Sequence, residues 1–97
     1  MLYNFEWDPA KASSNAEKHG VTFEQATGIF QDPMALTLYD EDNTSSNEDR
    51  WVTLGKVNGE YYLVVAHTYH DFPHHTVIIR LISARPATKR EIAQHQG

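Results

Sequence analysis

The chain has no cysteine in its 97 residues. This absence excludes a disulfide scaffold and thiol chemistry. No apolar run is long enough to cross a membrane and no N-terminal segment resembles a signal peptide, so we expect a cytoplasmic protein without a membrane partner. The sequence also lacks the glycine patterns of phosphate-binding and dinucleotide-binding loops, and the G-x-S-x-G turn of many hydrolases. We therefore expect no cofactor.

What the chain does contain is typical of one small globular domain. Apolar residues make up 40% of it and aromatic residues 11%, which is enough to form a core and far from the composition of disordered chains. A length of 97 residues leaves no room for a second independent core. We predict a single domain that covers residues 1–97.

The charge of the chain is unevenly distributed. A net charge of −5 argues by itself against a nucleic-acid partner, because phosphate binding requires a basic surface. Five of the thirteen acids, however, lie within one polar stretch, and they are Asp40, Glu41, Asp42, Glu48 and Asp49. The other eight acids equal the eight Lys and Arg residues in number. Outside this acidic loop the chain is neutral and can present a local basic face.

The hydrophobic pattern predicts an α+β fold. Asp8-Pro9 is typical of a helix start and Gly20 of a helix end, while Thr22 and Gln25 form a capping box that opens a second helix. From residue 34 the apolar positions alternate with a period of two, as in strands. The expected order is a strand at 3–7, helices at 9–19 and from 22 to about 32, strands at 34–39, 50–57, 60–69 and 76–83, and a short C-terminal helix from Pro86 or Thr88. The last four strands are expected to form an antiparallel meander.

Asn58-Gly59 is a strong hairpin signal, because a type I′ turn needs positive φ at both central positions. A two-residue loop would pair Val57 with Glu60. In that register Arg50 lies opposite His67, so a guanidinium and an imidazole become neighbours on one face.

Two groups of polar residues are candidates for binding phosphate. Lys11, Asn15 and Lys18 recur at helical spacing, with His19 beside them at the helix end. They form either a solvated helix face or a phosphate-binding ridge.

The second group, Arg80, Ser83 and Arg85, lies at the end of the last strand, where two planar guanidinium groups and a hydroxyl can converge on one phosphodiester. Arg80 interrupts an apolar run, so it needs either a cleft or an ion pair. Its alternative is an internal salt bridge to Glu6, Asp8 or Glu91.

Four of the six histidines, His67, His70, His74 and His75, lie within one stretch. Their spacing matches no zinc signature, so we predict no metal site. Tyr, Trp and His side chains are also able to stack on unpaired RNA bases.

Several motifs together resemble the BrnT family. They are Phe5-Glu6-Trp7-Asp8, Lys11, Asn15, Lys18-His19-Gly20-Val21, Phe23, Ala26, Asp32-Pro33, Glu48, Arg50, Leu63-Val64-Val65, Arg80-Leu81-Ile82-Ser83-Ala84-Arg85, Ala87 and Glu91. The resemblance implies a RelE-like fold and a ribonuclease toxin that halts translation. It also implies neutralisation by a ribbon-helix-helix antitoxin of the BrnA kind in a hetero-oligomeric complex, and binding of operator DNA only through that antitoxin.

We therefore interpret the chain as a metal-independent endoribonuclease, in which the 2′-hydroxyl of the RNA attacks the adjacent phosphorus. Such a reaction needs proton exchange and cations around the developing charge. The candidates are Arg50, Arg80 and Arg85 for charge stabilisation, His19 or His67 for proton exchange, and Lys11, Asn15, Lys18 and Ser83 for RNA binding. The alternatives are a non-catalytic protein-binding module and a metal-dependent enzyme that uses the His-rich hairpin.

Overall fold

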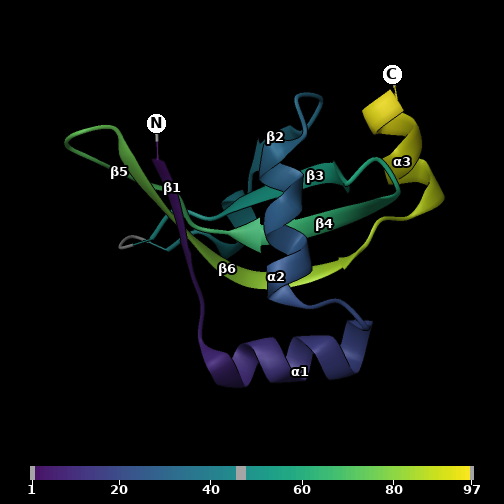
Figure 1. The fold of residues 1–97 in the computed structure, drawn as a ribbon, viewed down its shortest axis with the longest axis horizontal. Coiled ribbons are helices and arrows are strands. Elements are labelled where there is room, and N and C mark those ends of the chain that lie inside the picture. Colours follow the sequence, from purple (N-terminus) through teal and green to yellow (C-terminus); the bar gives the residue numbers. More distant parts are fainter. Residues whose placement is uncertain (1, 46–47, 97) are drawn as a thin grey trace.

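The computed structural model describes residues 2–45 and 48–96 of the chain. A twisted sheet carries helices against it (Figure 1). The elements are β1 (Leu2–Glu6), α1 (Pro9–His19), α2 (Phe23–Ala26), the 3₁₀ helix η1 (Thr27–Gln31), β2 (Leu36–Tyr39), the 3₁₀ helix η2 (Glu41–Asn43), β3 (Trp51–Val57), β4 (Tyr61–His67), β5 (His70–Phe72), β6 (Thr76–Pro86) and α3 (Lys89–Gln96). The predicted α+β class is confirmed.

The strands form one sheet in the order β1-β6-β4-β3-β2, and β5 also pairs with β6. The neighbours β2, β3, β4 and β6 are antiparallel, which confirms the predicted meander. β1 lies parallel to the first half of β6, with Glu6 opposite Arg80. The sequence pattern predicted neither this parallel pairing nor β5, which falls in the expected hairpin loop and consists of three exposed residues.

The helix ends form as their capping residues predict. The Asp8 side chain accepts a hydrogen bond from the Ala10 N–H, and Gly20 closes α1 with a φ of 70°. Both bonds of the Thr22–Gln25 capping box are present. The second helix is shorter than expected, because its α-helical part ends at Ala26 and continues as the tighter 3₁₀ helix η1.

The β3–β4 turn has the expected conformation but a longer loop. Asn58 and Gly59 have φ values of 52° and 70°, and the Glu60 N–H donates to the Val57 carbonyl. Val57 nevertheless pairs with Tyr61, because Glu60 belongs to the loop. The predicted register is therefore wrong by one residue.

This difference changes the neighbours at the far end of the hairpin. Trp51 lies opposite His67, and the predicted pair of Arg50 with His67 is wrong. Arg50 lies one residue before β3 begins and is not paired with His67.

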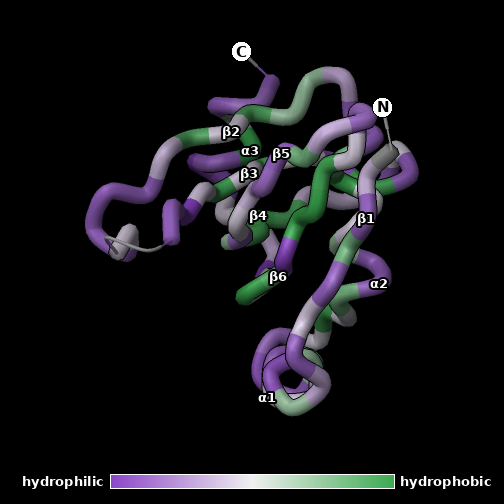
Figure 2. The backbone as a smooth tube through the Cα atoms, turned by 90° about the vertical axis from the view of Figure 1, so that its left-hand side faces the viewer, coloured by the Kyte–Doolittle hydropathy of each residue, from purple (hydrophilic) through white to green (hydrophobic). Residues whose placement is uncertain are grey.

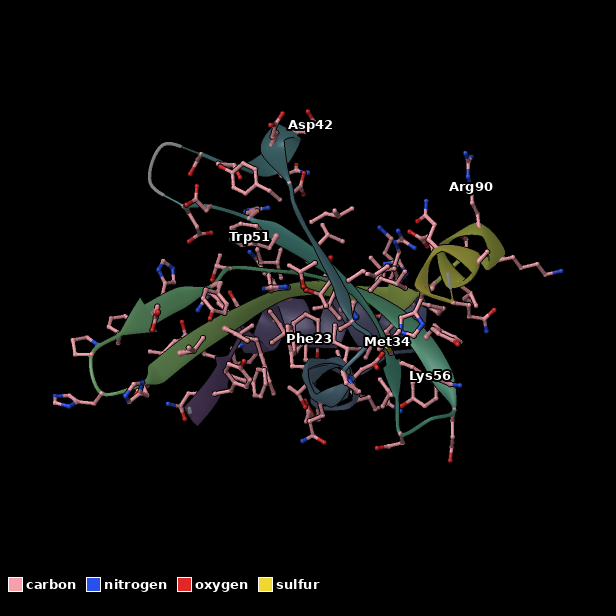
Figure 3. The ribbon with its side chains drawn as sticks, turned by 90° about the horizontal axis from the view of Figure 1, so that it is seen from above. Phe23, Met34, Asp42, Trp51, Lys56 and Arg90 are labelled. Carbon is pink, nitrogen blue, oxygen red and sulfur yellow. The ribbon has the colours of Figure 1, made fainter. Side chains whose placement is uncertain are left out.

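One face of the sheet, here the helical face, packs against α2 and η1, and its core continues beneath α1. Figure 3 shows Phe23 of α2 next to this face. The core residues are Val21, Phe23, Ala26, Ile29, Val57, Leu63, Val65, Val77, Ile79, Leu81 and Ala84. Hydrophobic stretches of the chain gather in the sheet, while α1 and the loop after β2 are hydrophilic (Figure 2).

The opposite face, here the outer face, carries the alternate residues of β3 and β4, among them Val52, Val64 and Ala66. α3 packs at one end of it, where the ring of His95 meets the ring of Tyr62 edge to face. A helix of eight residues is too short to be stable alone, so these contacts hold it in place.

A buried polar contact fixes α3 more firmly. The His95 Nε2 lies 2.8 Å from the Asp32 Oδ2, and both side chains are less than 10% exposed. The backbone N–H groups of Met34 and Lys56 also donate to this carboxylate. Burial opposes ionisation of Asp32, but these hydrogen bonds and the contact with His95 outweigh it and hold its pKa below the ordinary value.

Candidate active site

A groove of about 340 Å³ lies between α1 and β6. It brings together five of the residues that the sequence singled out, namely Lys11, Asn15, Lys18, His19 and Ser83. Four of them come from α1, where their spacing places them on the side that faces β6. The predicted shared face is confirmed, and its opposite wall is the second half of β6.

Asn15 holds this groove together. It is 7% exposed, and its amide nitrogen donates to the carbonyl oxygens of Val21 at 3.0 Å and Ala84 at 2.8 Å. Its Oδ1 accepts from the Ala84 N–H at 3.0 Å. β1 pairs with β6 only as far as Arg80, so Asn15 satisfies an edge of β6 that β1 leaves open. We predicted that Asn15 contacts RNA, and this is corrected, because its amide hydrogens are used inside the protein.

The remaining groove residues stay accessible. Lys11 and Lys18 are exposed, and His19 and Ser83 are half-buried. Lys18 and His19 lie in the last turn of α1, where the helix dipole favours positive charge. Two ammonium groups, one imidazole and one hydroxyl around a groove can bind a phosphodiester and exchange a proton with it.

Arg80 forms an ion pair with Glu6, which is one of the three partners predicted for it. Its Nη1 lies 3.7 Å from the Glu6 Oε1, across the parallel β1–β6 pair. The two side chains are 41% and 54% exposed, so water screens this contact and leaves the guanidinium accessible. Arg80 is therefore available to an anion that approaches β6.

The guanidinium of Arg85, unlike that of Arg80, is bound by the carboxylate of Glu91 on α3. The two nitrogens Nη1 and Nη2 each lie 2.9 Å from a carboxylate oxygen, a bidentate geometry. The hydrogen bonds from Arg85 lower the pKa of Glu91 to about 2 against the opposing effect of burial. Arg85 thus clamps α3 to β6, and the structure does not place it in the groove.

Arg50 lies at the other end of the sheet, where the acidic loop returns to β3. Its N–H donates to the Thr44 hydroxyl, and its carbonyl accepts from the Asp40 N–H. The structure does not bring Arg50 together with His67 or with the α1–β6 groove.

His67 is buried on the helical face with 2% of its surface exposed. Its Nδ1 lies 3.0 Å from the Thr68 carbonyl, which only accepts, so Nδ1 carries the hydrogen. Nε2 therefore accepts from the Thr53 hydroxyl at 2.7 Å, and that oxygen lies 2.8 Å from the Thr37 hydroxyl. Burial lowers the pKa of His67. A neutral ring with both nitrogens bonded to protein has no atom left to exchange a proton with RNA.

His67 instead contributes to a pocket of about 400 Å³, here the aromatic pocket, which sequence reasoning missed. It is lined by Tyr3, Phe30, Ala35, Thr37, Trp51, Thr53, His67, Tyr69 and Ile79. The four aromatic rings other than His67 come from β1, η1, β3 and the segment after β4, so no local motif indicates them. The richness of the chain in aromatic residues was the one available signal.

The His-rich hairpin is exposed. His70 lies on β5, and His74 and His75 form its turn with positive φ values of 69° and 60°. Within residues 2–45 and 48–96, no three His, Asp or Glu side chains gather closely enough to hold a metal ion.

Comparison with known proteins places the chain in a family. The model of the family described as "Ribonuclease toxin, BrnT, of type II toxin-antitoxin system" matches residues 7–91. The chain belongs to the BrnT family. The crystal structure of the Brucella abortus ribonuclease toxin BrnT superposes with a TM-score of 0.61 and 21% sequence identity, and covers 92% of this chain and 100% of that one. At this identity the likeness shows the fold. None of the curated proteins matches the chain.

The BrnT match has two consequences. It runs from Trp7 to Glu91 and so includes α1, the second half of β6 and the groove between them. Membership in this family of ribonuclease toxins also implies an antitoxin partner. Among the described residues, no helix is long and apolar enough to cross a membrane.

Proposed function

We propose that this BrnT toxin cuts RNA internally and without a metal ion, and that the α1–β6 groove is its active site. The observation that carries the proposal is the convergence of Lys11, Lys18, His19 and Ser83 on one groove in a chain of a ribonuclease family. In the reaction the RNA 2′-oxygen forms a bond to phosphorus while the bond from phosphorus to the 5′-oxygen breaks. The products are a 2′,3′-cyclic phosphate and a 5′-hydroxyl.

The groove residues divide this work by their chemistry. His19 takes the proton from the 2′-hydroxyl and gives it to the leaving 5′-oxygen, because a ring nitrogen of an imidazole can both accept and donate a proton. Lys11 and Lys18 hold the phosphate oxygens on which charge develops, and the Ser83 hydroxyl donates a further hydrogen bond. Arg80, three residues before Ser83 on β6, adds a screened but accessible positive charge on the same strand.

Two of the predicted cationic residues lie outside the proposed active site. Arg85 acts through α3, which it clamps by Glu91. Arg50 lies just before β3, two strands away from Ser83 in the sheet and at the base of the acidic loop, so our proposal gives it no part in cleavage. Neither touches the reacting atoms.

The wider function follows from the family. We propose that RNA cutting inhibits translation in the cytoplasm, and that a ribbon-helix-helix antitoxin of the BrnA kind neutralises the toxin in a hetero-oligomeric complex. Operator DNA binds to the antitoxin part of that complex, since the toxin itself carries a net charge of −5.

The direct test incubates the purified full chain with single-stranded RNA in excess chelator, followed by analysis of the fragment ends. We expect cutting that survives chelation, with cyclic phosphate ends, and no cutting of a strand that lacks the 2′-hydroxyl. Activity that needs a divalent ion, or fragments with a 3′-hydroxyl, contradicts the mechanism. A chain that binds its antitoxin but cuts no RNA supports the binding-module alternative.

Variants locate the site. His19→Asn should lower the cutting rate by about 100-fold, and Lys11→Ala with Lys18→Ala by about tenfold or more. Lys89→Ala is the matched control, since it removes an exposed lysine from α3. Equal losses in all three proteins would show that the groove is not the site.

Arg80→Ala separates catalysis from stability. Its ion pair with Glu6 is exposed, so the free energy of unfolding should fall by less than about 1 kcal/mol. Growth arrest on expression should disappear. A variant that unfolds readily, or one that still arrests growth, contradicts this role.

A further inference from the structure

The edge of the sheet formed by β2 is exposed and apolar. In the described part of the chain, β2 pairs with β3 on one side and with no strand on the other. All four of its residues are exposed, and Leu36 and Leu38 present 43% and 73% of their surface to water. An apolar edge strand with free backbone groups is a template for another strand, and proteins that leave one open use it for pairing.

The aromatic pocket lies directly beside this edge. Ala35 and Thr37 belong to its lining, while Leu36 and Leu38 point to the other face of the sheet. A strand added next to β2 would therefore send alternate side chains over the two leucines and toward the pocket.

The lining of the aromatic pocket fits an apolar side chain. The hydroxyls of Thr37 and Thr53 and the two nitrogens of His67 bond to one another and to the backbone. Its walls are Trp51 and other aromatic rings, and its lining contains no Lys, Arg, Asp or Glu. Among these inner groups no donor or acceptor is left free, and the aromatic walls fit a large side chain with an apolar body.

The charge around this edge favours a cationic partner. β2 runs directly into the acidic loop, and the Tyr39 hydroxyl donates to Asp49 of that loop at 2.9 Å. Tyr39 also packs edge to face on Trp51, which links the acidic loop to the pocket wall. Carboxylates here repel the phosphates of RNA and attract Lys and Arg side chains.

We propose that an extended segment of the antitoxin adds as a strand to the free edge of β2. It places a large apolar side chain in the aromatic pocket and basic side chains against the acidic loop. This surface is separate from the α1–β6 groove, so the proposal depends on the antitoxin implied by the family and not on the cutting mechanism.

The experiment uses the full chain and, as the probe, the full-length protein encoded beside its gene. Two variants disturb the surface without removing core: Ala35→Phe fills the pocket, and Leu38→Lys puts a positive charge on the apolar edge. Each has a matched control, Ala93→Phe on exposed α3 and Phe72→Lys on exposed β5. Thermal melting of every variant checks that it is folded.

We expect Ala35→Phe and Leu38→Lys to weaken binding of this probe by about tenfold or more, and the two controls to bind within about twofold of the wild type. Amide exchange at residues 36–39 should slow in the complex, while exchange at 70–72 stays unchanged. RNA cutting by the free variants should equal that of the wild type.

Binding that is unaffected by both surface variants overturns the proposal, as does exchange at residues 36–39 that does not slow. Protection of these amides by single-stranded RNA instead of the protein probe also overturns it, in favour of an RNA site. Loss of cutting in the wild type, with binding and β2 protection intact, would contradict the ribonuclease mechanism and leave this proposal standing.

Discussion

Glu91→Gln tests how strongly one ion pair fixes α3. Glutamine keeps the capping bond to the Thr88 N–H, so the change removes the charge and the bidentate pair with Arg85 but leaves the helix start intact. The pKa of Glu91 falls from 4.5 to about 2. A shift of this size corresponds at most to about 3.4 kcal/mol. Arg85 is 42% exposed and partly screened by water, so we expect a loss of about 1–2 kcal/mol in the free energy of unfolding.

The stability difference between Glu91→Gln and the wild type should depend on pH in a defined direction. Because the folded state lowers the pKa of Glu91, its contribution is complete above the unfolded pKa and disappears as the pH falls toward about 2. In thermal melts near pH 7 the variant should unfold about 4–12 °C below the wild type. The gap should narrow between about pH 5 and pH 2. A gap that is absent at neutral pH, or that persists undiminished in acid, refutes the reasoning.

Three further predictions concern the same fold. Asn15→Ala leaves the Ala84 N–H and two carbonyls without partners, so urea denaturation should show a free energy of unfolding lower by about 2–3 kcal/mol. An unchanged midpoint of the urea transition would contradict this prediction. His74→Gly relieves a φ of 69° and should raise the stability by about 1 kcal/mol, so a lower melting temperature would contradict strain at this turn. Asp32→Asn should destabilise the protein at neutral pH, and because the pKa of Asp32 is lowered in the fold, its deficit against the wild type should shrink below about pH 4.

The parts of the fold that the sequence predicted are those that local chemistry determines. The effects of Asp8, Gly20 and Thr22 can be predicted from the local sequence, because these residues act on backbone groups a few residues away. The hairpin register is different, because the same Asn58-Gly59 turn is compatible with a loop of two residues or of three. The parallel pairing of β1 with β6 joins distant segments that no local pattern connects.

The candidate site also combines residues that the sequence could predict with neighbours that only the tertiary fold brings together. Helical spacing placed Lys11 and Lys18 on one face, but their opposite wall, Ser83, becomes a neighbour only through the tertiary fold. Arg85 could be recognised as a phosphate-type residue, yet its partner Glu91 is seen only once α3 turns back onto β6. The burial of His67 likewise depends on η1, whose Phe30 packs against the imidazole.

The bonds between Asn15 and Ala84 join residues that are 69 positions apart. Contacts of such long sequence separation are expected late in folding, because closing the loop between them costs conformational entropy. During synthesis, α1 leaves the ribosome long before the strand that completes its groove. A growing chain therefore carries Lys11 and Lys18 before the groove that we propose as the active site exists, and that groove is complete only after β6 has emerged.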